Sequence, residues 1–145
     1  MQLTILTLKE NPQEAPYNTP DCQQLLAIYQ DYYSKVPFEP PWVAYMIRKE
    51  GQVVGSCSFV QPPAAGKVEI AYWTFQEFEG QGVASFACQQ LIAIAKKNNP
   101  ALTIIAKTAP EKNASTTILE KNGFHFSKIV QDEDIGDAWL WVLWN

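Results

Sequence analysis

The segment from Val68 to Lys107 constrains the fold more than any other part of the chain. Its first part, "VEIAYWTF" (68–75), is rich in β-branched and aromatic residues and predicts a strand, and "LTIIAK" (102–107) predicts a second, buried one. Between them, apolar residues recur at helical spacing and predict one face of a helix: Val83, Phe86, Ala87, Leu91, Ile94 and Ala95. A strand, a helix and a strand in succession form a right-handed crossover with parallel strands. The chain is therefore expected to have an α/β fold.

The rest of the chain adds elements on both sides of this crossover. "EGQ" between two strand-like runs predicts a hairpin, and Gly123 is expected to cap a short helix. The further expected elements are strand 3–8, a helix from Thr19–Asp21 to before Pro37, strands 43–49 and 53–60, helix 109–123, and strands 124–130 and 138–144. The order is β-α-β-β-β-α-β-α-β-β. It predicts one domain over residues 1–145, with a twisted mixed sheet of about seven strands and helices on both faces.

Charge and composition exclude several classes of partner. The net charge of -4 and the pI near 4.9 argue against nucleic-acid binding, which needs a basic surface. The longest strongly apolar run, "AWLWVLW", is too short to span a bilayer, and the amino-terminal residues do not resemble a signal peptide. We expect no membrane association and a cytoplasmic location.

The cysteines and the single histidine do not form a metal-binding pattern. Cys22, Cys57 and Cys88 are isolated and odd in number, which indicates reduced thiols. His125 follows Phe124 in a predicted strand, where a structural role is expected. No metal site is predicted.

Two glycines open the predicted helix of the crossover. Gly80 and Gly82 flank Gln81, and glycine permits positive φ and the close approach of a ligand to the backbone. Helix N-termini bind phosphates readily. A P-loop is excluded because Val83 and Ala84 follow in place of Lys-Ser/Thr, and a dinucleotide fingerprint is not complete. From these residues alone, a tight turn and an anion-binding loop remain equally open.

A series of motifs in fixed order resembles one known family. "EIAYW" (69–73), "EGQGVA" (79–84) and "NASTTILEKNGF" (113–124) are similar to motifs of the GNAT N-acetyltransferases, in particular the branch that includes the ribosomal-protein alanine acetyltransferases. The similarity runs from about Val68 to Phe126. It implies a GNAT-like fold, acetyl-CoA as co-substrate and no metal.

The resemblance implies a set of cofactor-binding residues. In the family, the glycine turn holds the pyrophosphate of acetyl-CoA, and the end of the preceding strand offers backbone groups to the pantetheine arm. Carried onto this chain, the set is Trp73, Thr74, Phe75, Glu79, Gly80, Gln81, Gly82, Val83, Ala84, Asn113 and Thr116. Plain core packing is the alternative for the side chains of Trp73 and Phe75, and an ordinary helix N-cap is the alternative for Asn113. Glu79 departs from the family pattern, which has arginine or glutamine there, so weaker CoA binding is a hypothesis.

Two residues are candidates for catalysis. Glu69 lies in an otherwise apolar strand, where burial would raise its pKa toward a value useful for a general base, unless its side chain faces solvent. The resemblance implies that Ser115 protonates the departing thiolate. The tyrosine that many family members use for this step is replaced by Leu119.

The acceptor is expected to bear a primary amine. Tyr32, Tyr33, Phe38 and Trp42 would form an aromatic wall of the acceptor pocket. The segment before the hairpin is shorter than in typical members of the branch, which puts a ribosomal-protein substrate in doubt. "AWLWVLW" would be sheet core, an acceptor wall or a dimer contact, so a monomer or a homodimer is expected. An acyl-CoA-binding sensor or interaction module with weak or no catalysis is the alternative function, and a domain that binds no ligand is a third.

Overall fold

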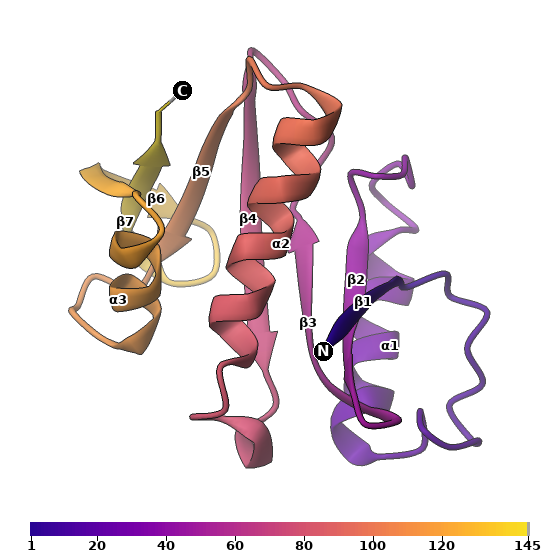
Figure 1. Ribbon diagram of the computed structural model, residues 1–145. Helices are drawn as coiled ribbons and strands as arrows, with labels where there is room; N and C mark the ends of the chain where they lie inside the picture. Colours follow the sequence, from indigo (N-terminus) through magenta and orange to yellow (C-terminus); the bar gives the residue numbers. More distant parts are fainter. Residues whose placement is uncertain (145) are drawn as a thin grey trace.

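The computed structural model describes residues 1–144 and contains one mixed sheet, whose strand order is β1-β2-β3-β4-β5-β7-β6. Figure 1 shows α2 and α3 in front of this sheet and α1 behind it. The elements are β1 (Gln2–Ile5), α1 (Pro20–Tyr32), β2 (Ala44–Lys49), β3 (Gln52–Phe59), β4 (Lys67–Thr74), the 3-10 helix η1 (Gln76–Phe78), α2 (Val83–Asn98), β5 (Thr103–Thr108), α3 (Ala114–Lys121), β6 (His125–Asp132) and β7 (Gly136–Leu143). The predicted α/β class, element order and mixed sheet are confirmed.

Strand pairing follows from the chain order. β4 and β5 are parallel because α2 connects them as a crossover, and every other pair of neighbouring strands described is antiparallel. The predicted hairpin is confirmed as β2 and β3, and its tip is formed by Glu50 and Gly51, which both have positive φ.

The two faces of the sheet carry separate cores because side chains alternate along each strand. On β2, Ile47 packs in the core that contains Leu91 of α2, whereas Met46 packs in the core that contains Leu25 of α1. The α3 residue Leu119 belongs to the core on the α2 face. All residues predicted for the inner face of α2 are buried or partly buried in this core. The helices thus cover both faces, as the sequence predicts.

The first strand is shorter than predicted. It ends at Ile5 rather than Leu8, because Leu8 has a φ of 67° and has left the extended conformation. Leu6 still belongs to the core, and its N–H donates to the carbonyl of Ala44 over 3.0 Å.

The helix ends agree with their sequence signals. Thr19 caps α1 by accepting a hydrogen bond from the N–H of Cys22, and Pro20 occupies the first turn, where its missing N–H costs nothing. Gly123 follows α3 with a φ of +91°, as a left-handed C-terminal residue should. Among residues 1–144, no helix combines the length and apolar character needed to cross a membrane.

Candidate active site

The two parallel strands of the sheet separate partway along their length. β4 pairs with β5 only from Lys67 to Ile70, opposite Thr103 to Ala106. Beyond Ile70, the residues from Ala71 to Thr74 remain paired with β3 on their other side. The backbone groups that β4 turns toward β5 in this stretch therefore lack a strand partner, and they form an edge inside the sheet.

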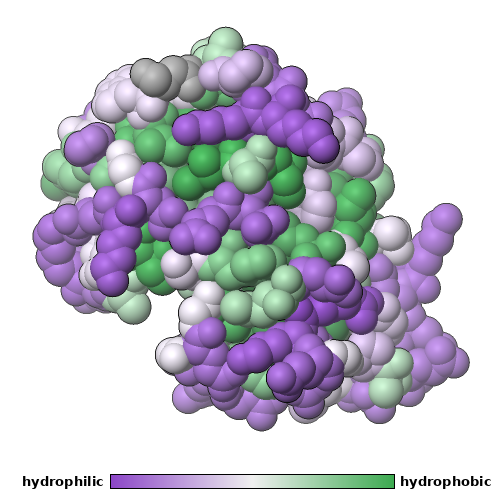
Figure 2. Space-filling model, in the orientation of Figure 1, coloured by the Kyte–Doolittle hydropathy of each residue, from purple (hydrophilic) through white to green (hydrophobic). Residues whose placement is uncertain are grey.

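A cleft of about 790 Å³ opens at this separation. We call it the β4–β5 cleft; it lies between the end of β4, the glycine turn and the first residues of α2 and α3. Figure 2 shows the outline of the molecule indented between the starts of these two helices. The lining residues are Tyr72, Trp73, Thr74, Glu79, Gly80, Gly82, Val83, Ala84, Ser85, Asn113, Ala114, Ser115 and Ile118. Nine of the residues predicted for cofactor binding or catalysis thus line one cavity, although they come from three separate motifs.

The glycine turn has the conformation that its sequence suggests. Gly80 and Gly82 have φ values of +77° and +80°, which disfavour any residue with a Cβ. An added Cβ would meet no atom within 4 Å at either position, so φ rather than crowding requires glycine here. Gly82 is the N-cap of α2 and provides no side-chain cap, so the first N–H groups of the helix lack intrahelical partners beside the cleft.

Gln81 does not line the cleft, in contrast to its two glycine neighbours. Its side-chain carbonyl accepts a hydrogen bond of 3.1 Å from the Lys49 ammonium at the end of β2. The Gln81 side chain therefore attaches the turn to the β2–β3 hairpin. Glu79 does line the cleft, so this chain has an acidic residue at the turn where an anion would bind.

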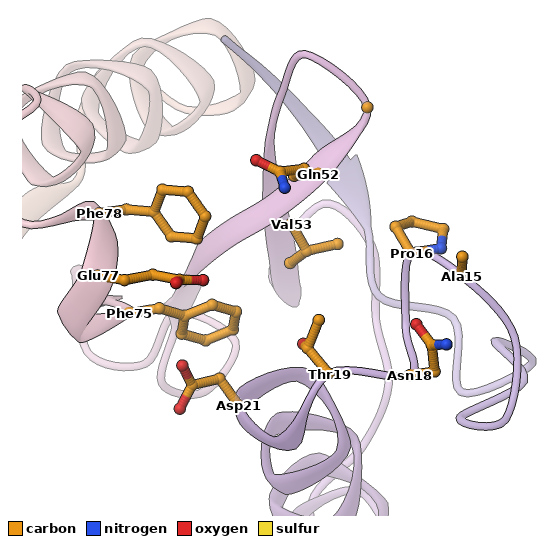
Figure 3. A pocket seen from close by; sticks show the side chains of 11 residues that line it. Ala15, Pro16, Asn18, Thr19, Asp21, Gln52, Val53, Phe75, Glu77 and Phe78 are labelled. Atoms are coloured by element: carbon orange, nitrogen blue, oxygen red, sulfur yellow. The ribbon is translucent and has the colours of Figure 1, made fainter.

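Phe75 and Thr116 also lie outside the cleft. The N–H of Phe75 donates to Val54, so it is not available to a ligand, and its carbonyl already accepts from Phe78. The Phe75 ring is 1% exposed and borders a different hollow with Phe78 and Val53, next to the start of α1 (Figure 3). Core packing is the correct alternative for this side chain, because after Thr74 the chain turns into η1.

Thr116 forms a capping box with Asn113. The N–H of Thr116 donates to Asn113 Oδ1 over 3.1 Å, and the N–H of Asn113 donates to Thr116 Oγ1 over 3.0 Å. Thr116 is fully buried, so it supports the site from behind without touching a ligand. Asn113 is both a helix cap and a lining residue of the cleft. Its amide NH₂ has no partner among residues 1–144 and can therefore donate to a ligand.

Tyr72 is a site residue that the sequence reasoning missed. Ser115 Oγ donates to its hydroxyl over 3.3 Å, and that hydroxyl donates to the Ser115 carbonyl over 3.2 Å. Burial raises the pKa of Tyr72 to about 12, so its hydroxyl stays protonated. The available signal was strand alternation: Tyr72 follows Val68 and Ile70 on the face that packs against α2 and α3.

The Glu69 side chain lies on the opposite face of the sheet from Ile70. It is partly buried, and it forms an ion pair. Its Oε1 lies 3.6 Å from the Nζ of Lys107, which is 3.9 Å from Oδ2 of Asp132. Burial raises the pKa of Glu69, and the Lys107 ammonium opposes that shift. Sequence reasoning missed Lys107 and Asp132, because their strands come together with β4 only in the folded sheet.

A second cavity, of about 630 Å³, lies over Glu69. We call it the Glu69 hollow; its walls are the β3–β4 turn, the start of β4, the second half of β5 and the acidic β6–β7 turn. It is lined by Val60, Gln61, Pro62, Ala64, Lys67, Val68, Glu69, Ile105, Lys107, Gln131, Asp132, Glu133 and Asp134. The β4–β5 cleft and the Glu69 hollow thus flank the point where the two strands separate.

None of the four residues predicted for the aromatic wall is among the residues that line the β4–β5 cleft or the Glu69 hollow. Tyr33 stacks on Tyr29 and accepts a hydrogen bond from the N–H of Ala44, which makes it a structural residue. Trp42 packs against Phe59, and Phe38 packs against Tyr33. Only Tyr32 is near enough to Glu69 for the carboxylate to contribute to raising the tyrosine pKa, after burial and Tyr29.

The carboxyl-terminal aromatic strand is mixed in character. Trp141 is buried and donates to Thr108 over 2.9 Å, whereas Trp144 is exposed. His125 is exposed at the start of β6. Among residues 1–144, no three His, Cys, Asp or Glu side chains lie close enough together to hold a metal ion.

Comparison with protein families gives one match that covers most of the chain. The family model described as "Acetyltransferase (GNAT) domain" matches residues 5–125. The chain is also 30% identical over 97 residues to the ribosomal-protein-serine acetyltransferase of Escherichia coli (strain K12). That alignment covers 66% of this chain, and the chain spans only 54% of the length of that relative.

Solved structures share the fold. A putative acetyltransferase from Acinetobacter baylyi ADP1 superposes with a TM-score of 0.69 over 99% of this chain and 92% of its own, at 16% identity. The ribosomal L7/L12 alpha-N-protein acetyltransferase RimL, in complex with coenzyme A, has a TM-score of 0.63 at 18% identity. It is matched over 84% of this chain and 70% of its own.

Proposed function

Because the chain belongs to the GNAT acetyltransferase family, we propose that it transfers the acetyl group of acetyl-CoA to a primary amine. The observation that carries the proposal is the β4–β5 cleft, in which an unpaired strand edge, a left-handed glycine turn and the start of α2 line one cavity. Coenzyme A and acetyl-CoA are bound in the solved structures of RimL and of the microcin C7 self-immunity acetyltransferase MccE, respectively.

The cleft offers partners for the pyrophosphate and for the pantetheine arm of the donor. The free N–H groups at the start of α2, together with the helix dipole, suit the pyrophosphate. The unpaired backbone from Ala71 to Thr74 suits the amides of the pantetheine arm, which would pair with β4 in place of β5. The free amide of Asn113 can donate to a carbonyl of the same arm.

The chemistry requires a neutral amine next to the thioester. The amine nitrogen attacks the acetyl carbonyl carbon, the C–S bond breaks, and CoA leaves as a thiolate. Glu69 takes the proton from the amine, directly or through a water, from the side of the Glu69 hollow. On the cleft side, Ser115, whose hydroxyl donates to that of Tyr72, would protonate the departing thiolate.

The Glu69 hollow is the place we assign to the acceptor. Four carboxylates and two lysines line it, which favours an amine that arrives as an ammonium ion. The E. coli relative is a ribosomal-protein-serine acetyltransferase, so a protein or peptide N-terminus is one candidate for the acceptor class, and a small amine is another.

A module that binds acyl-CoA without turnover is a second candidate. Two observations favour it: the acidic residue Glu79 lines the cleft, and the fully buried Leu119 occupies the position of the usual catalytic tyrosine. Both functions require a donor in the cleft, and they differ in turnover alone.

Calorimetry and a thiol-release assay test the proposal together. We expect acetyl-CoA to bind, and we expect CoA thiol to appear when a panel of amines and basic peptides is added. Glu69→Gln should lower kcat/KM by about two orders of magnitude, the usual range for loss of a general base, and leave acetyl-CoA affinity unchanged. No binding of acetyl-CoA would contradict both functions, and binding without turnover over a broad panel would favour the module.

A further inference from the structure

Lys107 lies where the proposed catalytic machinery and the β6–β7 turn meet. Its ammonium is 3.6 Å from Glu69 on β4 and 3.9 Å from Asp132 at the end of β6. Among residues 1–144, it is the one lysine that forms ion pairs with two carboxylates. The side chains of Lys107, Glu69 and Asp132 are 32%, 24% and 25% exposed, so solvent screens these pairs only in part.

The backbone holds Lys107 firmly at this point. It follows Ala106, the last residue of β5 that pairs with β4, and it still pairs with Leu140 of β7. Lys107 is therefore anchored where the two strands separate, and it lines the Glu69 hollow.

Asp132 is fixed as well. Its Oδ1 accepts hydrogen bonds from the N–H groups of Asp134 over 2.9 Å and Ile135 over 3.3 Å, which stabilises the β6–β7 turn. Its other oxygen, Oδ2, faces Lys107. The turn thus holds one partner of the ammonium in place, and this leaves the ammonium within reach of Glu69.

We propose that Lys107 is a positioning residue that keeps the Glu69 carboxylate ionised and directed into the Glu69 hollow, where it can accept a proton. The proposal rests on the proposed function, because only an acetyl transfer gives Glu69 a proton to accept. If Glu69 took no part in the reaction, its ion pair with Lys107 would only join the strands, and removing Lys107 would shift the pKa of Glu69 without changing the pH dependence of the reaction.

The sign of the effect follows from the charges around Glu69. The groups that face it, besides Lys107, are Asp132 of β6, Tyr32 of α1, Lys67 of β4, and Glu133 and Asp134 of the β6–β7 turn. Burial and Asp132 raise the pKa of Glu69, and Lys107 lowers it. Removing the ammonium must therefore raise the pKa, and removing the Asp132 charge must lower it.

The first experiment is the pH dependence of kcat/KM for thiol release in four variants. Lys107→Met should move the acidic limb to higher pH by at least about one unit, the usual effect of losing an opposite charge at this distance. Asp132→Asn should move the limb to lower pH, because it removes a like charge near Glu69. The asparagine oxygen can still cap the turn. Lys107→Arg should restore the wild-type profile. Lys35→Met, which removes an exposed ion pair with Asp31 on the first helix, should leave the profile unchanged.

The second experiment needs no turnover. Carbon-13 NMR of the Glu69 carboxyl should give a higher pKa in Lys107→Met and a lower one in Asp132→Asn than in the unmodified protein. A Glu69 titration unchanged by Lys107→Met overturns the proposal, and so does a shifted titration with an unmoved pH–rate profile. Absence of thiol release from the unmodified protein, with every amine tested, would instead contradict the proposed function.

Discussion

At the scale of single residues, Glu79 is the residue that fits the proposed ligand least, because it is acidic and the ligand is an anion. This acidic residue lines the cleft shortly before the free N–H groups of α2, where phosphates would lie. Backbone donors do not depend on the side chain, so binding can survive the change, but like charge weakens it.

Glu79→Arg is therefore expected to tighten acetyl-CoA binding. The change replaces a repelling charge with an attracting one, and we expect a Kd about tenfold lower at low ionic strength, with Glu79→Gln between the two and the differences shrinking as salt is added. Isothermal titration calorimetry measures this directly.

Glu77→Arg is the matched control for that comparison. Glu77 carries the same charge two residues earlier but borders the hollow of Figure 3 rather than the cleft. An equal gain in affinity from Glu77→Arg would mean that net charge, and not a local contact, governs binding.

At the scale of elements, the proposed donor binding depends on the left-handed backbone conformation of the glycine turn. Gly82 has a φ of +80°, so an alanine there must adopt the left-handed conformation or distort the start of α2. Gly51, at the tip of the β2–β3 hairpin, has nearly the same φ of +78° and the same open surroundings.

Substitution of each glycine therefore separates an effect on the free energy of unfolding from an effect on acetyl-CoA affinity. Gly82→Ala and Gly51→Ala should each lower the free energy of unfolding by about 1 to 2 kcal/mol, because the strain is the same. Only Gly82→Ala should also weaken acetyl-CoA binding, since Gly51 lies outside the cleft. Chemical denaturation and calorimetry on both variants test this, and equal losses of affinity would argue against a binding role for the turn.

Elements were predictable from sequence where local signals were strong. Thr19 and Pro20 give the start of α1, and the periodic face from Val83 to Ala95 gives α2. The end of β1 was not predictable, because nothing in "LTILTL" marks Leu8 as the residue with positive φ.

The site was predictable as far as motifs define it, and no further. Gly80, Gly82 and Asn113 line the cleft as predicted. They could be predicted because each belongs to a short motif that is visible in the sequence. Phe75 was misplaced because the turn into η1 uses its backbone groups, and the Lys107 pairs were missed because they join residues from three strands. Contacts between strands depend on register, which a single sequence does not specify.

At the scale of the whole molecule, buried cysteine thiols and tyrosine hydroxyls make the stability of the fold sensitive to alkaline pH. Burial raises the pKa of Cys57 to about 12 and of Cys88 to about 11, from 9.0. It likewise raises the pKa of Tyr33 and Tyr72 to about 12, from 10.0. Between these limits the folded chain binds more protons than the unfolded chain, so the free energy of unfolding falls as pH rises.

We therefore expect the Tm to be steady below pH 9 and to fall from pH 9 to 11. Each buried thiol lowers the free energy of unfolding by about 1.4 kcal/mol per pH unit over the pH range in which it is ionised in the unfolded chain but still protonated in the folded chain. Thermal melts across this range, with Cys57→Ala as the variant, measure the effect. The slope above pH 9 should be smaller in the variant, and an identical slope would contradict the assignment.

The separation of β4 from β5 has a consequence for how the proposed enzyme would respond to its product. The residues that would pair with the pantetheine arm, Ala71 to Thr74, recognise a part of the donor that the reaction leaves unchanged. The product CoA would keep these backbone contacts and the contacts of its pyrophosphate with the glycine turn. Under the proposed function, CoA therefore competes with acetyl-CoA on nearly equal terms, and the rate follows the ratio of the two rather than the concentration of either.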